Sequence, residues 1–96
     1  MIKNYDGEKF EDLKDLTIVD FYADWCGPCK MMAKSLEELK DIDIIKVNVD
    51  ENEDLAKEYK VMSIPNLVFI KDGKEIENVV GFMSKYELED VIERLK

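Results

Sequence analysis

The residues able to do chemistry in this chain are concentrated in one short segment. The only two cysteines, Cys26 and Cys29, are separated by two residues, and the only tryptophan, Trp25, directly precedes them in the segment ADWCGPCK. The chain contains no histidine, which excludes Cys–His nucleophilic catalysis and imidazole acid–base chemistry. Thiol chemistry remains, assisted by carboxylates, lysines and tyrosines.

Three interpretations of the cysteine pair are open. A structural disulfide across so short a loop would stabilise the fold by only about 2 kcal/mol, because it removes little freedom from the unfolded chain. One chain with two cysteines cannot complete a zinc site, which needs four ligands, but two chains could share a metal or an iron–sulfur cluster. A reversible dithiol–disulfide couple is the interpretation that the surrounding sequence favours.

The placement of the two thiols divides the chemistry between them. Pro28 suits the first turn of a helix, so we predict a helix that begins just after Cys26. The Cys26 sulfur then points outward and faces the unpaired N–H groups of the first turn, which favour a thiolate. Cys29 falls on the apolar face with Met32 and Leu36, where its thiol is shielded. We expect Cys26 to attack a substrate disulfide and Cys29 to resolve the mixed disulfide.

Some group must take the proton from Cys29 before this thiol can attack, and Asp20 is the candidate. Asp20 lies within the apolar run TIVDFY, residues 17–22, where burial raises the pKa of a carboxyl group. Lys46 lies within a second apolar run, residues 44–49, and is the expected counter-charge of Asp20. A strand-end surface position for Asp20 and an edge position for Lys46 are the alternatives that remain open.

The elements that must position these groups follow from the apolar pattern. Alternation and β-branched residues predict strands, and steps of three and four predict helices. The pair Asp72-Gly73 indicates a hairpin turn, and Ser84 with Glu87 forms a capping box that opens the last helix. The order βαβαβαββα predicts an α/β fold, with a mixed five-stranded sheet flanked by helices on both faces, in a single domain spanning residues 1–96.

Composition limits the classes of function. The net charge of −9 argues against a nucleic-acid binder, which normally presents a basic face. No apolar run approaches the length of a membrane span, so no membrane association is expected. The first residues contain no apolar signal-peptide core, and a cytoplasmic protein is therefore expected.

The quoted segments resemble a known family. ADWCGPCK after Val19-Asp20-Phe21 closely resembles the active-site segment of thioredoxins. The segments KVNVD, SIP, KDG and VG resemble further family motifs in family order, and together they span essentially the whole chain. The resemblance implies a thioredoxin fold and a protein-disulfide reductase that cycles between dithiol and disulfide. A separate thioredoxin reductase would regenerate it, and client proteins with disulfides would be its substrates.

The resemblance also implies roles for individual residues. Cys26 would be the nucleophile and Cys29 the resolving thiol, with the uncharged Gly27 and Pro28 between them. Asp20 would be the buried acid–base group, with Lys46 beside it. A substrate-docking surface would gather around a cis-proline that faces the disulfide, and would comprise Trp25, Met62, Ile64, Pro65 (the cis-proline), Val80, Gly81 and Phe82. No bound cofactor and no metal are implied, and a monomer is expected.

Several positions depart from the family pattern. Lys34 lies in a region where relatives carry a helix-kinking proline, so we expect a less kinked helix. Asn66 follows the expected cis-proline in place of threonine, Tyr22 replaces a frequent tryptophan, and Phe82-Met83 is bulkier than usual. Two alternative functions remain: a glutathione-linked glutaredoxin-like protein, whose usual Cys-Pro-Tyr-Cys motif is absent, and a binding module that uses the same apolar surface.

Overall fold

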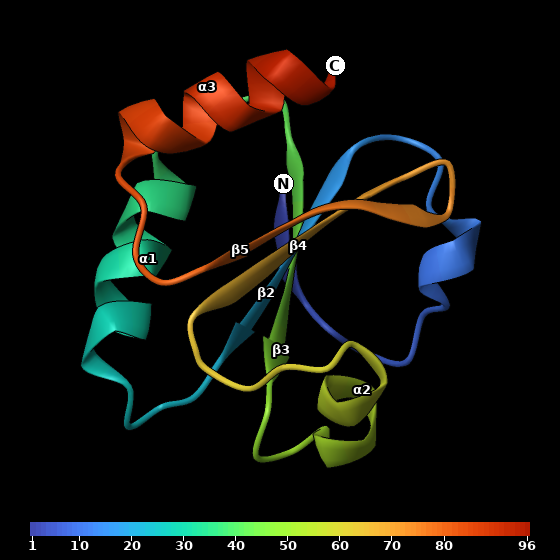
Figure 1. The fold of residues 1–96 in the computed structure, drawn as a ribbon, viewed down its shortest axis with the longest axis vertical. Coiled ribbons are helices and arrows are strands. Elements are labelled where there is room, and N and C mark those ends of the chain that lie inside the picture. Colours follow the sequence, from blue (N-terminus) through green and yellow to red (C-terminus); the bar gives the residue numbers. More distant parts are fainter.

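A computed structural model describes residues 1–96 and consists of a central sheet with helices on both faces (Figure 1). The elements follow the predicted order, except that the first helix is a single 3₁₀ turn, η1. Their bounds are β1 (Ile2–Asn4), η1 (Phe10–Asp12), β2 (Thr17–Tyr22), α1 (Gly27–Glu37), β3 (Asp43–Asn48), α2 (Glu53–Glu58), β4 (Asn66–Lys71), β5 (Lys74–Val80) and α3 (Lys85–Leu95).

The sheet is mixed, as the sequence predicts. Its strand order is β1-β3-β2-β4-β5, with parallel pairing of β1 with β3 and of β3 with β2. The hairpin β4–β5 joins the other side, and β4 is antiparallel to both β2 and β5. The carboxyl ends of β2 and β3 and the amino end of β4 therefore meet at one edge of the sheet, where the residues after β2 begin α1.

Two hydrophobic clusters fill the two sides of the sheet. Ile18 in β2 belongs to a cluster with Met32 and Leu36 of α1 and Leu88 of α3. The next residue, Val19, belongs to the opposite cluster, which contains residues of η1 and α2. This alternation is the period of two expected of a strand, and it places α1 and α3 on one face and α2 and η1 on the other.

The start of α3 and the turn of the β4–β5 hairpin form where the local sequence predicts them. Ser84 caps α3 by accepting a hydrogen bond from the Glu87 backbone, while the Glu87 side chain accepts from the Ser84 backbone. The hairpin turns at Asp72 and Gly73, both at positive φ, and their backbone N–H groups donate to the carbonyls of Lys14 and Leu13. None of the three α-helices combines the length and the apolarity that crossing a bilayer would need.

Candidate active site

The two cysteines lie at the start of α1 and are joined by a disulfide, with their Cα atoms 5.2 Å apart. Cys26 is the N-cap residue of the helix, and its sulfur accepts a hydrogen bond of 3.2 Å from the backbone N–H of Cys29. Pro28 lies in the first turn, where its missing N–H costs nothing. The predicted helix start, and the Cys26 sulfur facing a first-turn N–H, are therefore confirmed.

The expected difference in exposure between the thiols is wrong for the disulfide form. Cys26 is 5% exposed and Cys29 is 4% exposed, so Cys26 does not project outward. The reason is tertiary packing: Cys26 and Cys29 form a small buried cluster with Ala23, and Ile64 packs against it. The Cys26 sulfur lies 3.9 Å from the carbonyl oxygen of Ile64. The asymmetry between the two thiols lies in their positions on the helix and not in their exposure.

The segment that faces the disulfide comes from the start of the hairpin. The Ile64–Pro65 peptide bond is cis, as the sequence resemblance implied. The carbonyl oxygen of Pro65 accepts a hydrogen bond of 2.8 Å from the backbone N–H of Gly81, which has a φ of +97°. Val80 pairs with Asn66 in the ladder between β4 and β5. This pairing brings the residues around the cis-proline next to those at the end of β5.

Large apolar side chains are exposed around this edge of the molecule. Trp25 is 70% exposed, Met62 91% and Val80 60%, and Phe82 is also exposed. Trp25, Met62 and Ile64 line one apolar cavity of about 430 Å³, together with Val49 and Val61. Val80 lies in a different pocket that also includes Met62, and Phe82 lines neither. The structure thus brings most of the predicted docking residues together. Met62 lines both pockets, and the Gly81–Pro65 hydrogen bond holds the end of β5 beside the cis-proline.

Asp20 is a buried carboxylic acid, as predicted, and the surface alternative is wrong. It is 1% exposed, and neither carboxyl oxygen has a hydrogen-bond partner. Burial raises its pKa to about 6, against a smaller opposing effect of the Lys46 charge. Asp20 lies two residues after Ile18 in β2 and so points to the face that α1 covers. A group of this kind can hold or release a proton near neutral pH.

Lys46 lies beside Asp20 without forming an ion pair with it. The two residues are opposite each other in the parallel ladder of β2 and β3. The Lys46 amine lies over the Tyr22 ring, 4.6 Å from its centroid, in a cation–π contact. This contact was not predicted, although Tyr22 follows Asp20 by two residues and must share its face of the sheet. Lys46 therefore acts on the Asp20 carboxyl group through space.

Sequence reasoning also missed the partner of the tryptophan. The Trp25 indole N–H donates a hydrogen bond of 2.9 Å to the Asp50 carboxylate. The Asp50 backbone N–H in turn donates to the side-chain oxygen of Asn48, at the end of β3. The sequence did contain a signal for this hydrogen bond. Trp25 follows β2, Asp50 follows β3, and the carboxyl ends of neighbouring parallel strands lie together.

Comparison with known proteins decides what this arrangement is. The sequence profile of the family Thioredoxin matches residues 2–94. The chain belongs to the thioredoxin family. Thioredoxin of Staphylococcus aureus is 50% identical over 82 residues, which cover 80% of this chain and 79% of that protein.

Two solved structures of the family share this fold. A single-substitution mutant of a thioredoxin from Halobacterium salinarum superposes with a TM-score of 0.87 at 39% identity, over 97% of this chain and 88% of that one. The thioredoxin of Fasciola hepatica gives a TM-score of 0.79 at 41% identity, over 90% of this chain and 86% of that one.

Family membership and the cysteine pair together establish the reaction. The protein is a thiol–disulfide oxidoreductase of the thioredoxin family, and Cys26 and Cys29 form its redox-active disulfide. As a protein-disulfide reductase it passes two electrons to disulfides of client proteins and receives them from a reductase. No group of three or more His, Cys, Asp or Glu side chains is placed to hold a metal ion.

Proposed function

We propose that Cys26 is the thiol that attacks client disulfides and that Cys29 resolves the intermediate. The observation that carries this assignment is the N-cap position of Cys26, whose sulfur accepts a hydrogen bond from the Cys29 N–H. A first-turn N–H and the positive end of the helix dipole stabilise negative charge on that sulfur. Cys29 lies within the first turn of the helix and is bonded to Cys26 in this structure, so its sulfur is placed to attack a mixed disulfide at Cys26.

The reaction proceeds in two exchanges. The Cys26 thiolate attacks one client sulfur, and the other client sulfur leaves as a thiolate that takes up a proton. Cys29 then loses its proton and attacks the Cys26 sulfur, which releases the second client thiol. The product is the Cys26–Cys29 disulfide described above, and two electrons have moved to the client. A thioredoxin reductase returns them in a separate reaction.

We assign the proton transfer at Cys29 to Asp20. Its carboxyl group is buried, has no hydrogen-bond partner, and has a pKa raised to about 6. A group with a pKa near the working pH can both accept and return a proton. Lys46 supports this role, because its positive charge keeps the Asp20 pKa from rising further.

Clients dock on the apolar surface around the disulfide. This docking surface comprises Trp25, Met62, Ile64, Pro65, Val80, Gly81 and Phe82. An apolar patch on a protein with a net charge of −9 lets an extended client segment bind through contacts that need no charged partner. We expect a monomer that works in the cytoplasm, where reductases keep thiols reduced.

Single serine substitutions test the division of roles. Cys29→Ser should accumulate a stable mixed disulfide with a client, because the resolving thiol is missing. Cys26→Ser should neither reduce the client nor form the adduct. Mass spectrometry of both variants after incubation with a protein disulfide measures the outcome directly. Equal trapping by the two variants would refute the assignment.

A further inference from the structure

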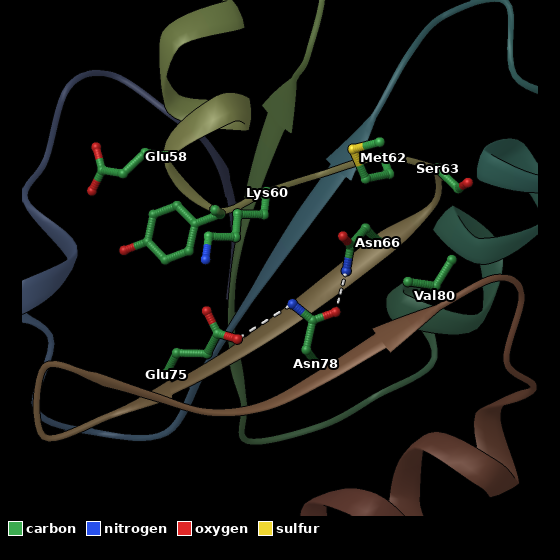
Figure 2. Close-up of a pocket in the computed structure, with 9 residues that line it drawn as sticks. Glu58, Lys60, Met62, Ser63, Asn66, Glu75, Asn78 and Val80 are labelled. Carbon is green, nitrogen blue, oxygen red and sulfur yellow. Dashed lines mark hydrogen bonds between the residues drawn. The ribbon is translucent and has the colours of Figure 1, made fainter.

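A second pocket adjoins the docking surface and is different in character. It has a volume of about 410 Å³ and lies between the end of α2 and the outer hairpin strand β5. Met62 and Val80 form the rim that it shares with the docking surface, while polar side chains form most of the remaining wall (Figure 2). A client segment that lies across the docking surface therefore passes the mouth of this pocket.

The register of the hairpin determines which side chains line the pocket. Val80 pairs with Asn66, and Asn78 pairs with Val68, so these residues share one face of the sheet. A β-bulge follows, and Ile70 pairs with Glu75 instead of Ile76. The bulge turns the Glu75 side chain toward the pocket and leaves Ile76 exposed elsewhere. Bulges commonly re-aim a side chain near a functional site.

A buried amide in the pocket wall has an unused acceptor. Asn66 is 2% exposed, and its side-chain N–H groups donate to the Asn78 side-chain oxygen at 2.8 Å and to the Val79 carbonyl at 3.1 Å. A backbone carbonyl can only accept, so these bonds fix which end of the amide is the nitrogen. No donor in the chain bonds the Asn66 side-chain oxygen. Asn66 belongs to the pocket lining, and Figure 2 shows this oxygen on the side of the amide away from Asn78.

The charges around the pocket are predominantly negative. Glu58 and Glu75 line it, and neither belongs to an ion pair of this chain. Glu75 accepts a hydrogen bond of 3.3 Å from the Asn78 side chain, which holds its carboxylate in place. Burial, and then the charges of Glu58, Glu11 and Glu75, raise the pKa of Tyr59 in the same wall. Lys60 is the only cation in the lining.

We propose that this pocket binds a lysine or arginine side chain of the client protein, a few residues from the cysteine that Cys26 attacks. Its lining carries two carboxylates and one amide oxygen, which only accept hydrogen bonds, against a single cation, Lys60. The hydroxyl groups of Tyr59 and Ser63 can accept as well as donate. Ammonium and guanidinium groups carry only donors and a positive charge, so they match this lining. The inference rests on the proposed docking of clients around Cys26, and it adds a preference for basic sequences.

Matched peptides test this preference. Each substrate is a disulfide-linked peptide dimer with a single cysteine, in which arginine or its neutral isostere citrulline is placed at successive positions on either side. Single-turnover rate constants with the pre-reduced protein measure the preference. At one or more positions the arginine peptide should react about five- to tenfold faster at low ionic strength, because two charge contacts and one hydrogen bond assist its binding. The ratio should fall as salt is added.

Two double variants separate the pocket from the overall charge. Glu58→Gln with Glu75→Gln should bring the arginine-to-citrulline ratio close to one. Glu89→Gln with Glu93→Gln removes the same charge from the exposed surface of α3 and should keep the wild-type ratio. The proposal is overturned if no position shows a preference, or if both double variants lower the ratio equally. If the wild type reduces neither peptide, or if Cys26→Ser still reduces them, the proposed function itself has failed.

Discussion

Replacing Asp20 by asparagine should make the oxidised protein more stable, relative to the wild type, at neutral pH than in acid. The Asp20 pKa rises from its ordinary 3.8 to about 6 because the carboxylate is buried without a hydrogen-bond partner. Each tenfold change in proton affinity is worth about 1.4 kcal/mol. The wild type therefore carries a cost of about 3 kcal/mol above pH 6 that it does not carry below pH 4.

The sign follows from where the protons are bound. Between about pH 4 and pH 6 the Asp20 carboxyl group is protonated in the folded protein and ionised in the unfolded chain, so folding takes up a proton. The contribution of Asp20 to the free energy of unfolding of the wild type therefore falls as the pH rises through that range. The asparagine side chain does not titrate, so the variant lacks this loss. Any fixed cost of burying the amide adds equally at every pH.

Urea unfolding followed by circular dichroism at a series of pH values measures the effect. All other carboxyl groups titrate alike in the two proteins, so the difference between them isolates Asp20. The free energy of unfolding of Asp20→Asn relative to wild type should rise by about 3 kcal/mol between about pH 3.5 and pH 8. A difference that does not change with pH would refute the raised pKa, and with it the proposed role of Asp20 in proton transfer.

Two further predictions concern backbone and tryptophan positions. Gly73→Ala should lower the free energy of unfolding by about 2–3 kcal/mol, since φ is +75° and a Cβ atom would overlap the Glu11 carbonyl. Gly7 is also at positive φ but lies in open space, so Gly7→Ala should lower the free energy of unfolding by only about 1 kcal/mol. Equal losses for the two variants in thermal unfolding would contradict this reasoning. Asp50→Ala should raise KM for a protein disulfide about two- to fivefold, because the Trp25 indole loses its hydrogen-bond partner. Asp50→Asn keeps an acceptor and should raise KM less; identical values would show that the bond does not position the indole.

The features that the sequence predicted correctly are encoded by neighbouring residues. The run around Asp20 is apolar on both sides, which identifies a central strand without knowledge of its neighbours. Pro28 locates the start of α1, and the capping box at Ser84 locates the start of α3. The first helix of the predicted order was less well specified. Phe10 and Leu13 lie three positions apart, and a step of three suits a 3₁₀ turn as well as an α-helix.

The features that were missed depend on segments far apart in the chain. The burial of Cys26 comes from Ile64, which is 38 residues away. The position of Glu75 depends on a bulge in the pairing of β5 with β4, and no local signal in KEIENVV predicts where that bulge falls. The Lys46–Tyr22 contact likewise requires the register of two strands. Such contacts become visible only when the pairing is known.

The two halves of the active site are attached to hydrogen-bonded neighbours in the sheet. The thiols follow β2, the cis-proline precedes β4, and these strands pair directly, with Phe21 opposite Asn66. No hinge separates the halves, so the catalytic cycle needs no domain movement. The outer surface of α3 lies at the opposite end of the molecule from the start of α1 (Figure 1). The protein should therefore keep its turnover when it is immobilised on a bead or an electrode through α3.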